Sequence, residues 1–207
     1  MYRSSVTVAA TGPGERAVLL PGLLPDAASF AILAQDNSVS WPAIHADPGL
    51  LLFLLTRHLT LQADVPPRLD DDDRRAAAEL RTRNDVPWVN WNEPALRPAV
   101  RTAHAAAHFA QLLAEQSEAV DPGHAWAGGW LAYMGWLAIG AVAPQAIVAC
   151  GSDLEFSRDP FATQLRHWGM RRAEIAWRLA NHWPLPRWAA VVLGRIDADP
   201  TKAGEFG

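Results

Sequence analysis

Two histidines, His104 and His108, lie four positions apart in the stretch AVRTAHAAAHFAQLLAEQ. On a helix this spacing places both imidazoles on one face, as in the HExxH zinc enzymes. The three residues between them are all alanine, so the glutamate that acts as general base in that motif is absent. We therefore expect a packed or partly exposed histidine pair rather than a zinc site.

The acidic run LDDDDRR, from Leu69 to Arg75, is a second candidate for metal chemistry. Clustered carboxylates suit Mg²⁺ or Ca²⁺, but an EF-hand loop spaces its ligands at alternate positions and needs a glycine and a distant glutamate. Neither residue is present at those places. Acidic residues at the start of the helix DRRAAAELRTR would instead complement its dipole, and we expect that role.

Other sequence motifs of known enzyme classes are absent, and so is the charge pattern of a nucleic-acid-binding protein. The sequence contains no nucleophile elbow, P-loop, dinucleotide fingerprint or CxxC motif, so those enzyme classes have no support. The net charge is -4, and the 18 basic residues are scattered along the chain. This distribution argues against nucleic-acid binding. We expect no catalytic residue, no metal and no cofactor.

Composition and targeting signals indicate an ordinary globular protein. Half of the 207 residues are hydrophobic and 19% are charged, which argues against disorder. Cys150 is the only cysteine and cannot form an internal disulfide. The N-terminus lacks the apolar core of a signal peptide, so we expect a cytoplasmic location.

An uncharged run from Pro122 to Ser152 holds the central element of the chain. The segment from residue 125 to residue 143 is long enough and apolar enough to cross a membrane as a helix. The cationic flanks of a spanning helix are missing, because no Lys or Arg occurs between Arg101 and Arg158. We therefore expect Trp126 to Ile139 to form one buried helix, enclosed by helices at 99–116 and 171–183, and no membrane association.

The rest of the chain also reads as helical, and the predicted fold class is all-α. Leu23 to Leu33 has apolar residues near helical spacing. Asp47 and Pro48 form a strong N-cap signal for a helix that is apolar on every side from Leu50 to Leu55. Further helices are predicted before residue 47, at 73–83, at Pro144–Cys150, from Asp159 to Gly169, at 171–183 and after Pro186.

We divide the chain into three parts. Residues 1–18 are expected to be an arm or a single edge strand, and residues 19–197 the helical domain. Within that domain an N-terminal lobe spans 19–84 and a second lobe spans 92–197. Residues 198–207 are expected to be a tail without a cap or apolar anchor, which suggests either that the chain was cut from a longer product or that its end frays.

Three stretches, in order, resemble the HDOD family, the helical signalling relatives of the HD metal-dependent phosphohydrolases. SWPAIHADPGLLLFLLTRHLT looks like the family's N-terminal pattern, and GGWLAYMGWLAI is similar to its segment AGLLHDIGKLAL. WGMRRAEIAWRLANHWPLPRWAAVVLGRID resembles the closing pattern. The resemblance implies an HDOD-like or HD-like helical bundle with an N-terminal lobe.

The resemblance also implies that the metal ligands of the catalytic relatives are lost. Their His-Asp pair falls on Ala132 and Tyr133, and their upstream histidine falls on Thr102, or on His104 in a shifted register. Their closing His-His pair falls on Arg195 and Ile196. Alanine and isoleucine have no donor atom, and a tyrosine normally stays protonated near neutral pH. Arg195 would offer an anion a fixed positive charge, although a surface or ion-paired arginine is the simpler reading.

The leading expectation is a non-catalytic signal-transduction module that acts on a protein partner or on a C-terminally fused signalling domain. The alternative is an HD-superfamily phosphohydrolase with relocated metal ligands. Its available donors are His104, His108, His124, His167, His182 and Asp153.

Overall fold

The computed structural model describes residues 5–8, 18–21, 39–57, 67–82, 89–117, 119–181 and 185–197. Within them the fold class is all-α, as predicted, with one small two-stranded sheet. The expected helix at Leu23–Leu33 and the tail 198–207 lie outside the described residues. Of the two lobes predicted from the sequence, the N-terminal one contains the helices α2 (Trp41–Ala46), α3 (Pro48–Thr56) and α4 (Asp71–Thr82). Those of the second lobe are α5 (Arg97–Ser117), α6 (Pro122–Leu131), α7 (Met134–Val142), α8 (Pro144–Gly151), η1 (Leu154–Ser157, a 3-10 turn), α9 (Pro160–Trp168), α10 (Arg172–Ala180) and α11 (Arg187–Gly194).

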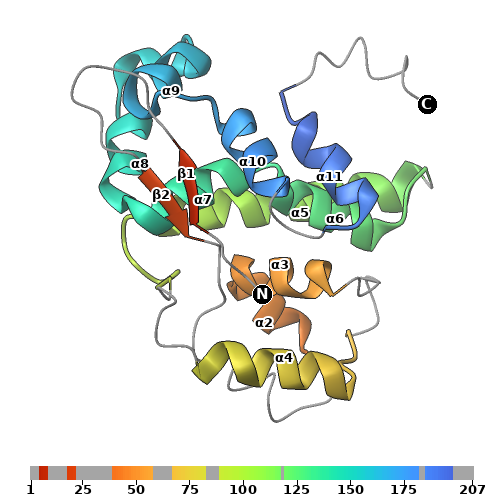
Figure 1. Cartoon of the computed structure of the whole chain (residues 1–207). Helices are drawn as coiled ribbons and strands as arrows, with labels where there is room; N and C mark the ends of the chain where they lie inside the picture. Colours follow the sequence, from red (N-terminus) through yellow and green to blue (C-terminus); the bar gives the residue numbers. More distant parts are fainter. Residues whose placement is uncertain are drawn as a thin grey trace.

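The N-terminal strands differ from the sequence prediction. β1 (Ser5–Val8) pairs antiparallel with β2 (Val18–Pro21), with Val6 opposite Leu20. The predicted single edge strand is therefore one half of a pair, and residues 19–21 are strand where the helical domain was expected to begin. β2 packs against α7 and β1 against α10, so Figure 1 shows both strands beside the second lobe.

The start of α3 follows the predicted cap. The Asp47 Oδ1 accepts hydrogen bonds from the backbone N–H groups of Gly49 at 2.9 Å and Leu50 at 3.1 Å. Pro48 occupies the first helical position, where its missing N–H costs nothing. Every residue from Pro48 to Leu55 is buried, as expected for a helix that is apolar all round.

The acidic run lies at the start of α4, and its carboxylates form hydrogen bonds and ion pairs within the protein. Asp70 and Asp73 cap each other, since the Asp70 Oδ1 accepts from the Asp73 N–H at 2.7 Å and the Asp73 Oδ2 from the Asp70 N–H at 3.3 Å. Asp73 is buried and pairs with the Arg57 Nε at 2.6 Å. The other two carboxylates pair with arginines one turn on, Asp71 with Arg74 and Asp72 with Arg75. The predicted helix is confirmed, with its first residue at Asp71 rather than Asp73.

The central run forms two helices, so the prediction of one helix from Trp126 to Ile139 is wrong. α6 ends at Leu131 and α7 begins at Met134, and the pair is bent by 45°. At the break the Tyr133 N–H donates to the Trp130 carbonyl at 3.0 Å, three residues back instead of four. In the described part of the chain no single helix is both long and apolar enough to cross a membrane; α6 and α7 pass that test only as a bent pair, by length and composition.

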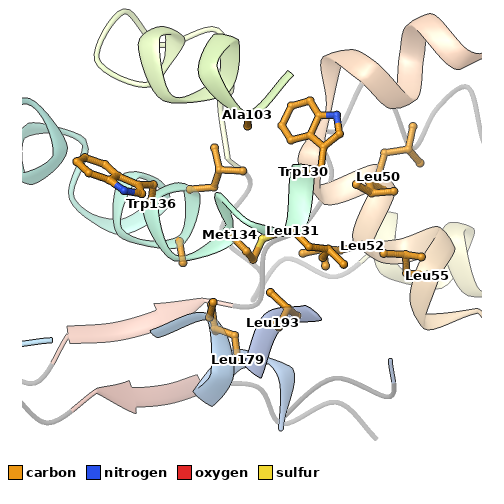
Figure 2. Close-up of a cluster of buried hydrophobic side chains, with 14 of the residues drawn as sticks. Leu50, Leu52, Leu55, Ala103, Trp130, Leu131, Met134, Trp136, Leu179 and Leu193 are labelled. Carbon is orange, nitrogen blue, oxygen red and sulfur yellow. The ribbon is translucent and has the colours of Figure 1, made fainter. Parts of the chain in front are cut away.

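The core lies where α6 and α7 meet their neighbours. Figure 2 shows Trp130 between Ala103 of α5 and Leu50 of α3, and Leu131 and Met134 facing Leu179 and Leu193. Trp130, Leu131 and Met134 have no exposed surface. α6 packs on α5 and α11, while α7 packs on α8 and α10. The expected enclosure of the run by the helices at 99–116 and 171–183 is thus confirmed, with α11 as a further neighbour.

Aromatic contacts attach α9 to the same core. The Trp136 ring lies 4.6 Å from the Trp168 ring and 5.5 Å from the Phe156 ring, both at nearly right angles. Such edge-to-face pairs are favoured over stacked ones. The Trp168 indole N–H also donates to the Ala146 carbonyl at 3.3 Å. Together these contacts hold α8, η1 and α9 against α7.

Candidate functional site

Ala132 and Tyr133 lie at the break between α6 and α7. Ala132 is the C-cap of α6 and Tyr133 the N-cap of α7. Both residues are half-buried. These are the two positions on which the sequence comparison placed the metal-binding His-Asp pair of the catalytic relatives.

A cation faces this break. The guanidinium carbon of Arg172 lies 5.7 Å from the centre of the Tyr133 ring, within the range of a cation-π contact. The Arg172 Nε and Nη2 donate to the Asp197 Oδ1 at 3.2 and 3.1 Å. The side chains are 26% and 11% exposed, so the pair is largely shielded from water and its two charges compensate each other.

The backbone of Arg172 is fixed as firmly as its side chain. Its N–H donates to the Gln164 Oε1 at 2.9 Å, and Gln164 is itself buried. Its carbonyl oxygen lies against Gly135, where an added β-carbon would overlap it. Gly135 therefore lets the start of α10 touch the first turn of α7. The sequence analysis missed Arg172; the MRRAE segment marked the helix start, but nothing in it predicted a contact across to Tyr133.

The residues predicted at the other ligand positions do not supply donors. Thr102 is exposed on α5, and its hydroxyl donates to the Pro98 carbonyl at 2.9 Å. Arg195 is the exposed C-cap of α11. Ile196 packs against the core. Together with Ala132 and Tyr133, this set does not fit a binuclear metal centre, which requires converging imidazoles and carboxylates.

The alternative histidines are spread over the surface. His104 and His108 are both exposed on α5, and the His104 ring lies 6.3 Å from the Trp130 ring. The His124 Nδ1 lies 3.2 Å from the Asp121 Oδ1, and its ring meets the edge of Trp188. His182 lies outside the described residues. Within the described ranges, no three His, Cys, Asp or Glu side chains are grouped to hold a metal ion.

Among the alternative donors that the structure describes, Asp153 and His167 lie within hydrogen-bond distance of each other. The His167 Nε2 lies 2.9 Å from the Asp153 Oδ2. The same oxygen is 2.5 Å from the Arg166 Nη2, and the Asp153 Oδ1 accepts from the Glu155 N–H at 3.0 Å. Hydrogen bonds from His167, the Glu155 amide and Arg166 lower the pKa of Asp153 to about 2. A carboxylate with three hydrogen-bond donors, one of them a guanidinium, is a poor ligand for a dication.

Cys150 does not offer a reactive thiol. The residue has no exposed surface. Burial, followed by the charge of Asp153, raises the pKa of its thiol to about 11. Since the thiolate is the nucleophile and the metal ligand, Cys150 belongs to the packing of α8.

Comparison with known proteins now adds to this geometry. Residues 89–193 match the family model of the HDOD domain. The fold is similar to a crystal structure of the MmoQ response regulator from Methylococcus capsulatus str. Bath, with a TM-score of 0.55 and 20% identity over 86% of this chain and 77% of that one. A second crystal structure, of a fragment of MmoQ, gives a TM-score of 0.55 and 21% identity over 86% and 75%. No curated protein matches the chain.

Proposed function

Because the chain belongs to the HDOD domain family, we propose that it is a non-catalytic regulatory module that signals through contacts with a protein partner or a fused signalling domain. One observation carries the proposal. Ala132 and Tyr133 stand at the break between α6 and α7, with the Arg172 guanidinium over the tyrosine ring. This is the place where the catalytic relatives are expected to hold metal.

Metal-assisted phosphoester hydrolysis depends on ions that activate water and clamp phosphoryl oxygens. Ala132 offers no ligand atom, and the Tyr133 ring already contacts Arg172. A dication placed between them would lie close to a guanidinium, and like charges in a partly shielded site repel. The side chains at the break therefore favour packing over hydrolysis.

A module that catalyses no reaction acts by presenting different contacts in two conformations. A ligand or partner that binds both conformations equally well does not shift the equilibrium between them. The similarity in fold to a protein named as a response regulator supports a role in signalling. We include a cytoplasmic location in the proposal.

The first experiment is metal analysis of the purified 207-residue chain, paired with a phosphodiesterase assay supplemented with Mn²⁺. We expect far less than one metal ion per chain and no Mn²⁺-dependent hydrolysis. The matched variant is His104→Ala with His108→Ala, which should behave like the natural chain. Stoichiometric metal that this variant loses would overturn the proposal in favour of a phosphohydrolase with relocated ligands.

The second experiment addresses the partner. The natural full-length product is used as bait in a pull-down, and any fused output domain is assayed with and without residues 19–197. We expect a specific partner, or an output that changes when the module is removed. A product with neither property would contradict the regulatory role.

A further inference from the structure

Helix α5 carries an apolar stripe on the side that faces away from α6. Phe109, Leu112 and Leu113 are 63%, 41% and 50% exposed. The buried side of the helix consists of alanines, namely Ala99, Ala103, Ala107 and Ala114. Three large apolar side chains of this 21-residue helix thus point into solvent, while its buried positions are alanines.

The exposed stripe has coiled-coil spacing. Thr102, Ala105, Phe109, Leu112 and Gln116 are all exposed and alternate by three and four positions along α5. This is the pattern by which one helix meets another along a seam. When two copies of the stripe run antiparallel, Ala105 lies opposite the partner's Phe109, and Thr102 opposite the partner's Leu112. Each layer therefore combines a small side chain with a large one, which is how facing helices fill a seam.

The charges beside the stripe indicate that the partner is a second copy of this chain and that the two α5 helices run antiparallel. Arg101 and Glu115 flank the same side of the stripe, two heptads apart. In the antiparallel register above, Arg101 lies opposite the partner's Glu115, and the pair is repeated by the two-fold symmetry. A parallel pair would instead place Arg101 opposite the partner's Ala106, so that no interhelical charge pair would form.

The charges of α5 also oppose its own dipole. The first turn has no acidic residue and contains Arg97, while the last turn has no basic residue and contains Glu115. A helix is stabilised by the reverse arrangement. An antiparallel neighbour removes the conflict, because its acidic C-terminal end lies beside the basic N-terminal end of α5.

From these features we infer that the exposed face of α5, made up of Arg101, Thr102, Ala105, Phe109, Leu112, Leu113, Glu115 and Gln116, is a self-association surface on which a second copy of this chain docks antiparallel. In the same register, Ala106 lies opposite the partner's Ala106 at the other flank of the stripe. The dimer is a weak one, since the seam spans only about four helical turns and small interfaces are transient. This inference does not depend on the proposed regulatory function.

The test is sedimentation velocity of the 207-residue chain from low micromolar to near-millimolar concentration. We expect reversible dimers whose affinity falls as salt is raised, because exposed charge pairs are screened. Arg101→Glu and Glu115→Arg should each weaken the dimer by about tenfold, or roughly 1.4 kcal/mol, because two attractive pairs become repulsive. Both substituted side chains are exposed, and circular dichroism of each variant should show that it keeps its helices.

Two combinations of these variants make the test specific. The double variant Arg101→Glu with Glu115→Arg should restore the dimer, and an equimolar mixture of the two single variants should form heterodimers in preference to either homodimer. Leu154→Glu and Arg187→Glu are matched controls, since both residues are exposed and belong to η1 and α11 rather than to α5; neither should change the affinity. A monomer at every concentration, or a dimer indifferent to the charge exchange, would overturn the inference.

Discussion

Gly129 of α6 lies so close to Ala107 of α5 that a β-carbon added at Gly129 would come within 2.5 Å of the Ala107 Cα. The nearest atoms belong to the backbone of Ala106 and Ala107, which cannot move aside as a flexible side chain would. The two helices therefore touch backbone to backbone, with alanines on one side and glycine on the other.

Replacing Gly129 by Ala or Leu should destabilise the protein. Overpacking of this kind costs about 1–3 kcal/mol, with leucine at the upper end. Urea denaturation followed by circular dichroism measures the change. Gly128→Ala is the matched control, because its added carbon would meet only the Val192 Cγ1 at 4.0 Å. The control should be neutral or slightly stabilising, since alanine is the better helix former; equal stability of the Gly129 and Gly128 variants would contradict the close contact.

Asp73 should contribute more to the folding stability of the protein than the neighbouring aspartates of the acidic run. Asp73→Ala removes the hydrogen bond to Arg57 and the cap on Asp70, a loss of about 1.5–3 kcal/mol for a hydrogen bond to charged groups. Asp72→Ala removes an exposed pair with Arg75 and should cost less than about 1 kcal/mol. Thermal denaturation of both variants in parallel measures the difference. Addition of Mg²⁺ or Ca²⁺ should not raise either melting temperature, and a clear rise in the natural chain would support a metal at this run.

The pair of Asp153 and His167 predicts a pH dependence with a defined sign. The folded pKa of Asp153, about 2, lies below the ordinary value of 3.8. A lowered pKa contributes stability that is present above the unfolded value and is lost as the pH falls from about 4 toward 2. The stability gap between the natural chain and Asp153→Asn should therefore shrink across that window. Carboxyl NMR titration gives the pKa directly, and a value near 4 would contradict the hydrogen bonds described for Asp153.

Cys150 should react slowly with thiol reagents in the folded protein. The side chain is fully buried and the pKa of its thiol is raised to about 11. At pH 8 a reagent therefore has little access to the sulfur atom, and little of the thiol is ionised to the reactive thiolate. Labelling with a disulfide reagent, with and without denaturing urea, measures the protection. We expect complete reaction of one thiol in urea and a rate at least about a hundredfold lower without it. Fast labelling of the folded chain would place Cys150 on the surface.

Most helices could be predicted because residues near their ends, such as N-capping aspartates and a C-terminal glycine, mark where they begin and end. Asp47 with Pro48, and Asp159 with Pro160, mark starts that the structure confirms by side-chain caps. Gly169 adopts a positive φ of 73° at the end of α9, a conformation open to glycine. In α10 the predicted apolar face, Ile175, Ala176, Leu179 and Ala180, is the buried face.

The break at Ala132 and the contact of Arg172 with Tyr133 could not be predicted in this way. No proline or charged residue interrupts the run from Trp126 to Ile139, so the sequence pattern predicts one continuous helix there. The bend arises where α7 turns to pack against α10, and Gly135 permits that approach. These are interactions between segments far apart in the chain, and local propensity does not report them.

The direct backbone contact between α5 and α6 also bears on how the chain reaches this fold. Ala107 and Gly129 are only about 20 positions apart in the sequence, and a short loop brings them together at a small entropic cost. Proteins rich in such near-neighbour contacts fold quickly. The α5–α6 hairpin is therefore expected to form early and to serve as the template on which α10 and α11 later dock, so that substitutions at Gly129 should slow folding, whereas substitutions in α11 should mainly speed unfolding.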